Sequence, residues 1–476
     1  MSHHKPDPNK SVTLTVDGQQ VTVPEGTRIL EAAQKAGVRI PTICDHPALG
    51  KRAVCRICVV ECNGRGKLMA ACANDAEEGM TIVTNNARIL GIRKTIVELL
   101  LANHPQECLT CIRSRKCELQ SLAERFGIRT PAFRHEALNI RPPETDGEAL
   151  VRNMNKCIKC GRCVEVCQEV QNVRAINSSH RSVNYEISTP YRQSLSDGAC
   201  IFCGKCAAIC PVGAIYEHDQ CDEAWEALNS KQRVAVQITQ SVGAVLDDEF
   251  GLPAGTITCG KMVTALKYLG FDKIFDAGSF AGMAVKETES ELLDRINNHG
   301  KSKKLLPLIT GSTPGWRSFV EHFYPDLTDH LTGCKNPRQV FAAMVSSSRA
   351  VSVSIAPHIA EKFEVKKAAL KPAAGGVDIA LTAQELGRMI RLAGIDIAAL
   401  PENPFDSVVF IAGDPSVTAN QKMLDFDDVY QGIKETELDL KGTMIKVLTA
   451  DGLANARIAL DSIRSGTCKA SLVRLD

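Results

Sequence analysis

Cysteine is the residue type whose number and spacing predict chemistry in this sequence. The chain of 476 residues contains twenty cysteines, and sixteen of them fall between Cys44 and Cys210. Closely spaced thiolates bind metal, and in a reducing compartment dense cysteines more often hold metal than form disulfides. The sequence up to Cys210 therefore predicts several metal centres.

The first group of cysteines has the spacing C-x10-C-x2-C-x13-C. Its members are Cys44, Cys55, Cys58 and Cys72. A long loop with one tight pair and two flanking thiolates can wrap a 2Fe-2S cluster, in which each iron takes two protein sulfurs. A zinc site is the alternative, although four-cysteine zinc sites usually pair two short C-x2-C knuckles. Cys62 lies outside the pattern.

The second group adds a histidine to three cysteines in the order H-x3-C-x2-C-x5-C. Its members are His104, Cys108, Cys111 and Cys117. Three thiolates can hold only three corners of a 4Fe-4S cluster. Taken alone, His104 is more often an ordinary residue at a helix end than a ligand, so the residues leave the fourth corner open.

Two copies of the run C-x2-C-x2-C-x3-C form the third and fourth groups. This run is typical of bacterial ferredoxins, in which the fourth cysteine of each run binds the cluster of the other run. The pattern therefore predicts one 4Fe-4S cluster on Cys157, Cys160, Cys163 and Cys210, and another on Cys167, Cys200, Cys203 and Cys206. Gln168 stands where proline is usual, and 32 residues separate Cys167 from Cys200.

The elements that position the first two groups can be predicted from local patterns. Residues 11–23 alternate β-branched and polar side chains around Asp17-Gly18, which indicates a β-hairpin. Residues 24–27 supply a turn and an N-cap for a short helix. A second helix is expected over 85–103, where apolar residues recur at helical spacing. Residues 141–150 are typical of a linker.

After residue 231, short β-rich runs alternate with amphipathic helical ones. The predicted strands are 234–238, 306–310, 350–355, 407–411 and 444–448, and the predicted helices are 259–269, 383–393 and 453–464. Such alternation favours an α/β region with parallel sheets. The whole chain is long enough for about three domains of roughly 150 residues.

Composition excludes several classes of protein. Hydrophobic residues make up 44% of the chain and charged residues 23%, and 56 basic side chains against 55 acidic ones give a formal charge of +1. Disorder and strong nucleic-acid binding are therefore not expected. No segment approaches the ~18 consecutive apolar residues of a spanning helix, and the N-terminus has no export features, so we expect a cytoplasmic protein. No G-x-G-x-x-G or Walker pattern supports direct nicotinamide or flavin binding.

The cysteine segments resemble known electron-transfer modules. The first group is similar to the plant-type ferredoxin domain and to the start of the large iron–sulfur subunit of respiratory complex I. That subunit and the large iron-only hydrogenases share the order of the second group, with histidine as the fourth ligand, so the resemblance implies that His104 binds. One 2Fe-2S and three 4Fe-4S clusters, about 14 irons, then indicate a conduit for single electrons.

The segment from 231 onward resembles the catalytic domain of iron-only hydrogenases. Six stretches carry this resemblance in the family's order: Val242–Leu252, Gly260–Asp272, Thr310–Trp316, Cys334–Pro337, Ser354–Glu364 and Val377–Leu400. The resemblance implies a common fold for this half of the chain.

The residues that hold the active-site cluster in those hydrogenases are replaced or missing. Thr313 stands at the first cysteine ligand, and Ser312 at the neighbouring cysteine that relays protons. His358 replaces the second ligand, and Glu361 replaces the lysine that contacts the di-iron cyanides. The last two ligands belong to a motif that lies beyond Leu475-Asp476. Loss of the di-iron site is therefore expected.

Three cysteines of this half, Cys259, Cys334 and Cys468, share no close spacing. We interpret them as buried or incidental thiols. The sequence leaves open a rebuilt cluster from Cys334, His358 and others.

These observations predict a multidomain α+β and α/β chain of four parts. The parts are a β-grasp 2Fe-2S ferredoxin domain at 10–84, a 4Fe-4S domain with one histidine and three cysteine ligands at 85–140, a 2x[4Fe-4S] bacterial-ferredoxin domain at 141–225 and an iron-only-hydrogenase-like domain at 231–476. No catalytic residue is expected in this chain.

The resemblance implies an electron-transfer subunit of an oxidoreductase complex. Such hydrogenase-like subunits occur with a flavin- and NAD-binding subunit, which holds the FMN, and with a small thioredoxin-like 2Fe-2S subunit. The best-known complexes include a formate dehydrogenase and couple formate, NAD and ferredoxin by electron bifurcation. The alternatives are a subunit of a hydrogenase complex, including one with a rebuilt redox site, and a hydrogenase-derived redox sensor or scaffold.

Overall fold

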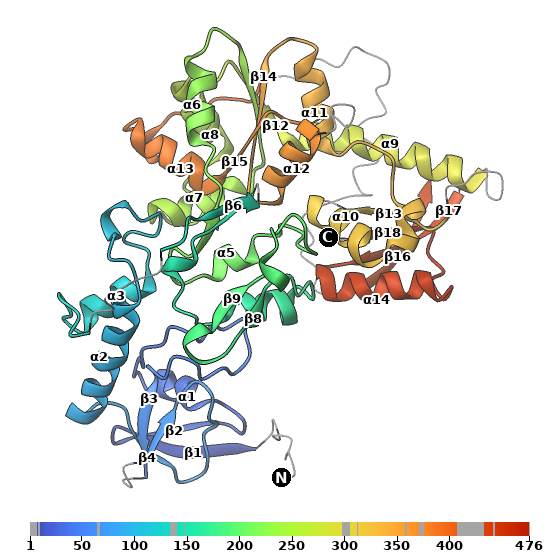
Figure 1. Cartoon of the computed structure of the whole chain (residues 1–476). Coiled ribbons are helices and arrows are strands. Elements are labelled where there is room, and N and C mark those ends of the chain that lie inside the picture. The colour runs from blue at the N-terminus through green and yellow to red at the C-terminus, as the bar shows by residue number, and fades with distance from the viewer. Residues whose placement is uncertain are drawn as a thin grey trace.

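The structure is a computed structural model. It describes residues 7, 10–63, 67–133, 140–147, 149–297, 305–311, 313–357, 359–370, 376–406, 433–440 and 443–475. Figure 1 shows the ferredoxin-like segment, in green, between the N-terminal sheet, in blue, and the two sheets of the C-terminal half.

A five-stranded mixed sheet and one helix form the N-terminal part. Its elements are β1 Ser11–Val16, β2 Gln19–Pro24, α1 Ile29–Lys35, β3 Val59–Cys62, β4 Lys67–Ala70 and β5 Thr81–Val83. The strand order is β2-β1-β5-β3-β4, and β1 pairs with β5 in parallel. Helix α1 buries Ile29, Ala32 and Ala33 in the same core as the strands. The sheet and the loop after α1 thus form one unit.

The predicted hairpin at Asp17-Gly18 is confirmed, but the predicted N-cap is wrong. The N-cap residue of α1 is Arg28, one residue after the predicted turn. The hydroxyl of Thr27 donates to the Pro24 carbonyl over 2.7 Å and closes the turn. Thr27 therefore serves the turn, and Glu31 instead accepts a hydrogen bond from the Arg28 backbone N–H.

Two helices flank the second cysteine group, as Figure 1 shows. Helix α2 spans Ala87–Ala102 and confirms the helix predicted over 85–103. Its N-cap is Asn86, whose side chain accepts from the Ile89 backbone N–H at 2.8 Å. Helix α3 spans Glu118–Arg125 and begins directly after Cys117.

The ferredoxin-like part consists of short elements. They are β6 Glu144–Gly147, β7 Leu150–Arg152, α4 Arg162–Glu165 with a π-helical turn at Val166–Val170, β8 Asn177–Ser179, β9 Glu186–Ser188, α5 Lys205–Ile209 and β10 Ile215–Glu217. The sheets have the orders β10-β7-β6 and β8-β9.

The prediction of a linker at 141–150 is therefore wrong. Strand β6 lies inside that segment, and Leu150 begins a buried strand. The error has a physical reason, because proline, glycine and charged residues also suit a short edge strand. Strand β6 pairs with β7 in a short, irregular hairpin, and β7 pairs in turn with β10, which follows much later in the sequence.

A parallel four-stranded sheet organises the first half of the C-terminal region. Its strands are β11 Val234–Ile238, β12 Lys273–Asp276, β14 Val351–Ala356 and β15 Ile379–Thr382, in the order β12-β11-β14-β15. The accompanying helices are α6 Cys221–Asn229, α7 Val242–Phe250, α8 Cys259–Leu269, α9 Ala277–Asn297, α11 Pro337–Ser346, α12 Ala360–Leu370 and α13 Ala383–Leu392. Every residue of β11 is buried, as expected for a central strand of a parallel sheet.

A second four-stranded sheet lies beside the first in Figure 1. Its strands are β13 Leu308–Gly311, β16 Ile433–Leu440, β17 Thr443–Ala450 and β18 Leu472–Leu475, with helices α10 Pro314–Phe323 and α14 Gly452–Arg464. The order is β13-β18-β17-β16, and β16 pairs with β17 antiparallel. The expected parallel pairing thus holds for the first sheet but not for all of the second.

The structure places the predicted helices 259–269, 383–393 and 453–464 as α8, α13 and α14. It also places four of the five predicted strands, and the run at 407–411 lies outside the described residues. Within the described part of the chain, the helices are too short or too polar to cross a membrane.

Candidate iron–sulfur sites

The structure brings the first cysteine group together in the loop between α1 and β3 and at the end of β4. The Sγ atoms of Cys58 and Cys72 lie 3.3 Å apart, and the Cys55 backbone N–H donates to the Cys44 Sγ at 3.5 Å. Hydrogen bonds from Cys55 and Cys72 hold the pKa of the Cys44 thiol well below its usual range. Cys62 is buried at the end of β3, where it lies opposite Lys67 of β4.

His104 offers a ring nitrogen to the second group. Its Nδ1 lies 2.8 Å from the Pro105 carbonyl oxygen, which can only accept, so Nδ1 carries the proton. The Nε2 atom is buried and has no hydrogen-bond partner among the described residues. Burial lowers the pKa of His104 and favours the neutral ring. A neutral imidazole with a free, oriented Nε2 lone pair suits a metal ligand.

The three cysteines of this group surround the start of α3. Cys117 is the N-cap of α3, and the charges of Cys111 and Cys108 act on its thiol. Cys108 is the exposed member, whereas Cys117 is buried. The group therefore lies close to the molecular surface on one side.

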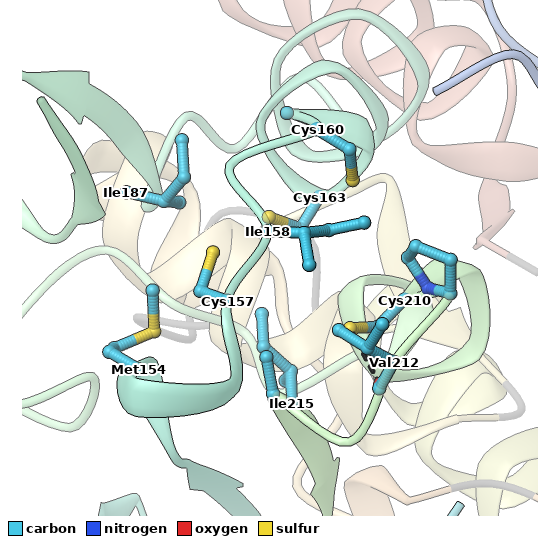
Figure 2. Close-up of a pocket in the computed structure, with 12 residues that line it drawn as sticks. Met154, Cys157, Ile158, Cys160, Cys163, Ile187, Cys210, Val212 and Ile215 are labelled. Atoms are coloured by element: carbon cyan, nitrogen blue, oxygen red, sulfur yellow. Dashed lines mark hydrogen bonds between the residues drawn. The ribbon is translucent and has the colours of Figure 1, made fainter. Parts of the chain in front are cut away.

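One cavity contains all four cysteines of the third group. Cys157, Cys160, Cys163 and Cys210 line it together with apolar neighbours. Figure 2 shows these cysteines around the same space with Met154, Ile158, Ile187, Val212 and Ile215. Cys210 comes from the second run and completes the set from the first. The grouping predicted from the ferredoxin pattern is the one that the structure brings together.

The fourth group combines three cysteines of the second run with one cysteine of the first run. The charge of Cys167, which belongs to the first run, acts on Cys200, Cys203 and Cys206. Cys167, Cys200 and Cys203 also pack against a core that contains Trp316 and Phe319 of α10. This group therefore faces the C-terminal half of the chain.

The two runs share one backbone conformation. Lys159 and Phe202 have φ of 58° and 52°, and the glycine two positions later, Gly161 or Gly204, has φ of 76° or 75°. Each glycine is the N-cap of the helix that carries the third cysteine of its run. An added Cβ at Gly204 would lie 2.7 Å from the Ile359 side chain. Glycine is required here by conformation and by space.

Burial has the same effect on the equivalent thiols of both runs. It raises the pKa of Cys157 and Cys200 to about 12, and that of Cys160 and Cys203 to about 11. Backbone N–H groups of Lys159 and Phe202 donate to the sulfurs of Cys157 and Cys200 at 3.4 Å. Such donors favour the thiolate, and a bound metal must displace the proton from each buried thiol.

The third group lies next to each of the other three. The charge of Cys44, in the first group, acts on Cys160, and the charge of Cys163 acts on Cys206 in the fourth group. A Cβ added to Gly213, three residues after Cys210, would lie 2.8 Å from the sulfur of Cys111 in the second group. The third group is therefore near each of the other three, and we call this place the junction.

In the hydrogenase-like half, Glu361 forms an internal ion pair. Glu361 on α12 is buried, and its carboxylate lies 2.7 Å from the Arg338 guanidinium. Ser354 donates to the same carboxylate at 3.1 Å. Thr313 is the N-cap residue of α10. Ser312 and His358 lie outside the described residues.

We expect Arg338→Met to destabilise the hydrogenase-like half by about 3–5 kcal/mol, because it leaves the buried Glu361 carboxylate without its cation. Thermal unfolding followed by the fluorescence of Trp225 and Trp316 measures the loss. Adding Glu361→Gln to Arg338→Met should recover most of it. An unchanged transition in Arg338→Met contradicts the interpretation of a buried ion pair.

The remaining cysteines of this half lie in separate places. Cys259 packs against the core of the parallel sheet and Cys468 against the core beneath α14. The Cys334 thiol donates to the Glu291 carboxylate at 3.2 Å. Glu291 lies 43 residues earlier in the chain and has no motif around it, so no sequence signal points to this contact.

Four family models match successive segments of the chain. A 2Fe-2S iron–sulfur cluster binding domain matches residues 9–87, and the NADH-ubiquinone oxidoreductase-G iron–sulfur binding region matches 93–132. The ferredoxin-like domain of NADH-quinone oxidoreductase subunit 3 matches 147–216. The C-terminal domain of the iron-only hydrogenase large subunit matches 232–475. The chain is thus a hydrogenase-like iron–sulfur protein with 2Fe-2S and 4Fe-4S domains.

Curated relatives fall into the same groups. The subunit HndD of the NADP-reducing hydrogenase of Solidesulfovibrio fructosivorans is 35% identical, over 96% of this chain and 85% of its own length. Iron hydrogenase 1 of Clostridium pasteurianum is 28% identical over 93% of this chain and 83% of its own. The mitochondrial NADH-ubiquinone oxidoreductase 78 kDa subunit of Candida albicans is 32% identical over 49% of this chain and 32% of its own.

The first of these similarities extends over nearly the whole chain, and the hydrogenase model covers half of it. The chain therefore belongs to the iron-only hydrogenase large-subunit family.

Proposed function

We propose that this chain is an electron-transfer subunit with four iron–sulfur clusters and no di-iron site of its own. The observation that carries the proposal is the third cysteine group, whose four sulfurs line one apolar cavity and lie next to every other group. Iron–sulfur clusters supply one-electron redox chemistry when bound. The protein residues hold them, exclude water and fix their order.

The ligand sets follow the four groups. They are Cys44, Cys55, Cys58 and Cys72 for a 2Fe-2S cluster; His104, Cys108, Cys111 and Cys117 for a 4Fe-4S cluster; Cys157, Cys160, Cys163 and Cys210 for a second; and Cys167, Cys200, Cys203 and Cys206 for a third. The buried thiols and the free Nε2 atom of His104 fit these roles.

We expect His104→Cys to keep the iron content and to lower the midpoint potential of its centre by on the order of 100 mV. A thiolate adds a negative charge where the neutral ring has none, and charge of this sign disfavours reduction. A potentiometric titration followed by electron paramagnetic resonance (EPR) measures the shift. His322→Cys, at an exposed histidine, is the control. An unchanged potential argues against His104 as a ligand.

The partners proposed are those of the related complexes. HndD belongs to an NADP-reducing hydrogenase, and the 78 kDa relative belongs to NADH-ubiquinone oxidoreductase. These names support a nicotinamide-linked partner, which we propose is a flavin- and NAD-binding subunit. The proposed complex also contains a thioredoxin-like 2Fe-2S subunit and exchanges electrons with ferredoxin. As the terminal enzyme we propose a formate dehydrogenase, in a cytoplasmic complex that bifurcates electrons.

The second candidate is a subunit of a hydrogenase complex, which the name of HndD favours. Glu361 supports the first candidate, because its carboxylate is bound by Arg338 and offers no cation to the cyanide ligands of a di-iron site. Thr313 likewise offers no thiolate at the expected ligand position.

Anaerobic purification of the native complex, with every subunit identified by mass spectrometry, tests the proposal. We expect a flavin subunit and a molybdenum or tungsten formate dehydrogenase, and no infrared bands of bound carbon monoxide or cyanide. Those bands, or a co-purifying di-iron hydrogenase without formate dehydrogenase, support the hydrogenase complex. Signalling proteins in place of both support a sensor.

A further inference from the structure

Arg162 is the buried cation at the junction of the cysteine groups. It is the first residue of α4, between Cys160 and Cys163, and only 3% of its surface is exposed. A fully buried guanidinium is rare unless its hydrogen bonds are satisfied by fixed partners. Its partners therefore show which parts of the molecule it holds.

The Arg162 guanidinium binds the parts that carry the first and second groups. Two of its nitrogens donate to the Glu118 carboxylate at 2.6 and 2.8 Å, and Glu118 follows directly after Cys117. One of these nitrogens also donates to the backbone carbonyl of Asp45 at 2.8 Å, and Asp45 follows Cys44. One side chain thus connects the neighbours of three cysteine groups.

A second contact of the same helix strengthens this connection. Glu165, at the end of α4, forms an ion pair with Arg52 and accepts a hydrogen bond from the Gly50 backbone N–H at 2.7 Å. Leu49 packs with Val166 and Ile209 in a small core at the same contact. The first and last residues of helix α4 therefore both bind the loop that carries the first group.

The charge of Arg162 acts where the groups meet. The guanidinium of an arginine is always charged in proteins, and both oxygens of the Glu118 carboxylate accept hydrogen bonds from it. The charges of Cys160 and Cys44 also act on this guanidinium. A fixed positive charge at this place stabilises any added electron nearby.

We propose that Arg162 is the positioning residue of the junction, which holds the third cysteine group against the first and second and places a buried positive charge among them. The inference rests on the proposed electron-transfer function. Transfer between neighbouring centres moves one electron and no proton, so its rate depends on the distance and on the potentials that Arg162 sets.

Two substitutions separate the position of Arg162 from its charge. Arg162→Gln removes the charge and the two-pronged contact with Glu118, whereas Arg162→Lys keeps the charge but cannot donate to Glu118 and Asp45 with the same geometry. Arg141→Gln is the control, because Arg141 is exposed and belongs to the same domain. Iron content, EPR midpoint potentials and magnetic coupling between centres are measured in the complete complex.

We expect Arg162→Gln to make the equilibrium constant for one-electron reduction of the third centre at least tenfold less favourable. This change lowers its midpoint potential by at least 59 mV. Arg162→Lys should keep the potential and weaken the magnetic coupling between the first and third centres. If Arg162→Gln does not bind iron, Arg162→Lys alone tests whether Arg162 holds the third group against the first. Unchanged magnetic coupling in Arg162→Lys then overturns the proposal.

Full iron content with unchanged potential and coupling in Arg162→Gln also overturns the proposal, and leaves the electron-transfer function in place. A wild-type chain without iron–sulfur EPR signals overturns the electron-transfer function and this inference together. Equal shifts in Arg141→Gln and Arg162→Gln would show a general charge effect and contradict a specific role for Arg162.

Discussion

Cys160→Ser is expected to abolish electron transfer between every pair of partners that the complex connects. Cys160 lines the cavity of the third group, which lies next to the other three groups. A serine hydroxyl is far less acidic than a thiol and does not replace a buried thiolate ligand. Stopped-flow reduction of ferredoxin by the complex measures the loss, and nicotinamide oxidation by the flavin subunit with an artificial acceptor should stay intact.

Cys203→Ser should have a narrower effect. Cys203 belongs to the fourth group, which faces α10 and α12: Phe202 stacks on Phe363 with ring centroids 4.2 Å apart. Only transfer to a partner on the hydrogenase-like side should therefore fail. Cys468→Ser is the matched control, because Cys468 packs against the same core as Cys203 but lies outside all four groups.

For Cys160→Ser, retained reduction of ferredoxin would falsify the proposal that electrons pass through the third group.

The cysteine groups could be predicted from the sequence because their geometry is local. Cys157, Cys160 and Cys163 lie within seven residues, and the short loop between them brings their sulfurs to one cavity. The exchange of Cys210 between the two runs could also be predicted, because the ferredoxin run is a symmetric repeat. Hairpins and amphipathic helices, such as β1–β2 and α13, are likewise encoded within a few residues.

The order of the groups could not be predicted, because contacts between distant residues set it. Arg162 and Asp45 are 117 residues apart, and Lys116 pairs with Glu249 across 133 residues. No spacing rule relates such positions. Strand β16 is a different case. Its exposed and half-buried residues alternate over 433–439 in the structure, but Ile433 lies on the exposed side and Lys434 on the half-buried side, so the sequence has no matching alternation of apolar and polar residues.

The altered hydrogenase positions show a further limit. The resemblance to the hydrogenases implies that Glu361 stands in place of a lysine, but it does not predict that Arg338 binds the Glu361 carboxylate. Arg338 also binds Glu364 at 3.0 Å, so one cation serves two acids of α12. A substitution that reverses charge is stable inside a protein only with such a partner. The ion pair therefore explains how this half of the chain accommodates the buried carboxylate of Glu361.

Removal of iron is expected to unfold the ferredoxin-like part while the parallel sheet stays folded. The elements of residues 149–217 are short, and their core contains the thiols of Cys163 and Cys206 themselves. The core of the parallel sheet contains four strands and several helices without any predicted ligand. Metal-binding free energy is folding free energy in small metal domains, ~10–16 kcal/mol for structural zinc in peptides. The first part therefore depends on its clusters and the second does not.

Hydrogen–deuterium exchange before and after anaerobic chelation with a thiol reductant tests this expectation. Amides in 149–217 should lose protection by about a thousandfold or more, whereas those of β11 and β14 should keep it. Protein carried through the same steps without chelator is the control. Equal protection of 149–217 with and without iron would mean that the apolar residues around the cavity suffice to fold this part.

Because the third group lies at the junction, loss of this part alone should also separate the first group from the fourth.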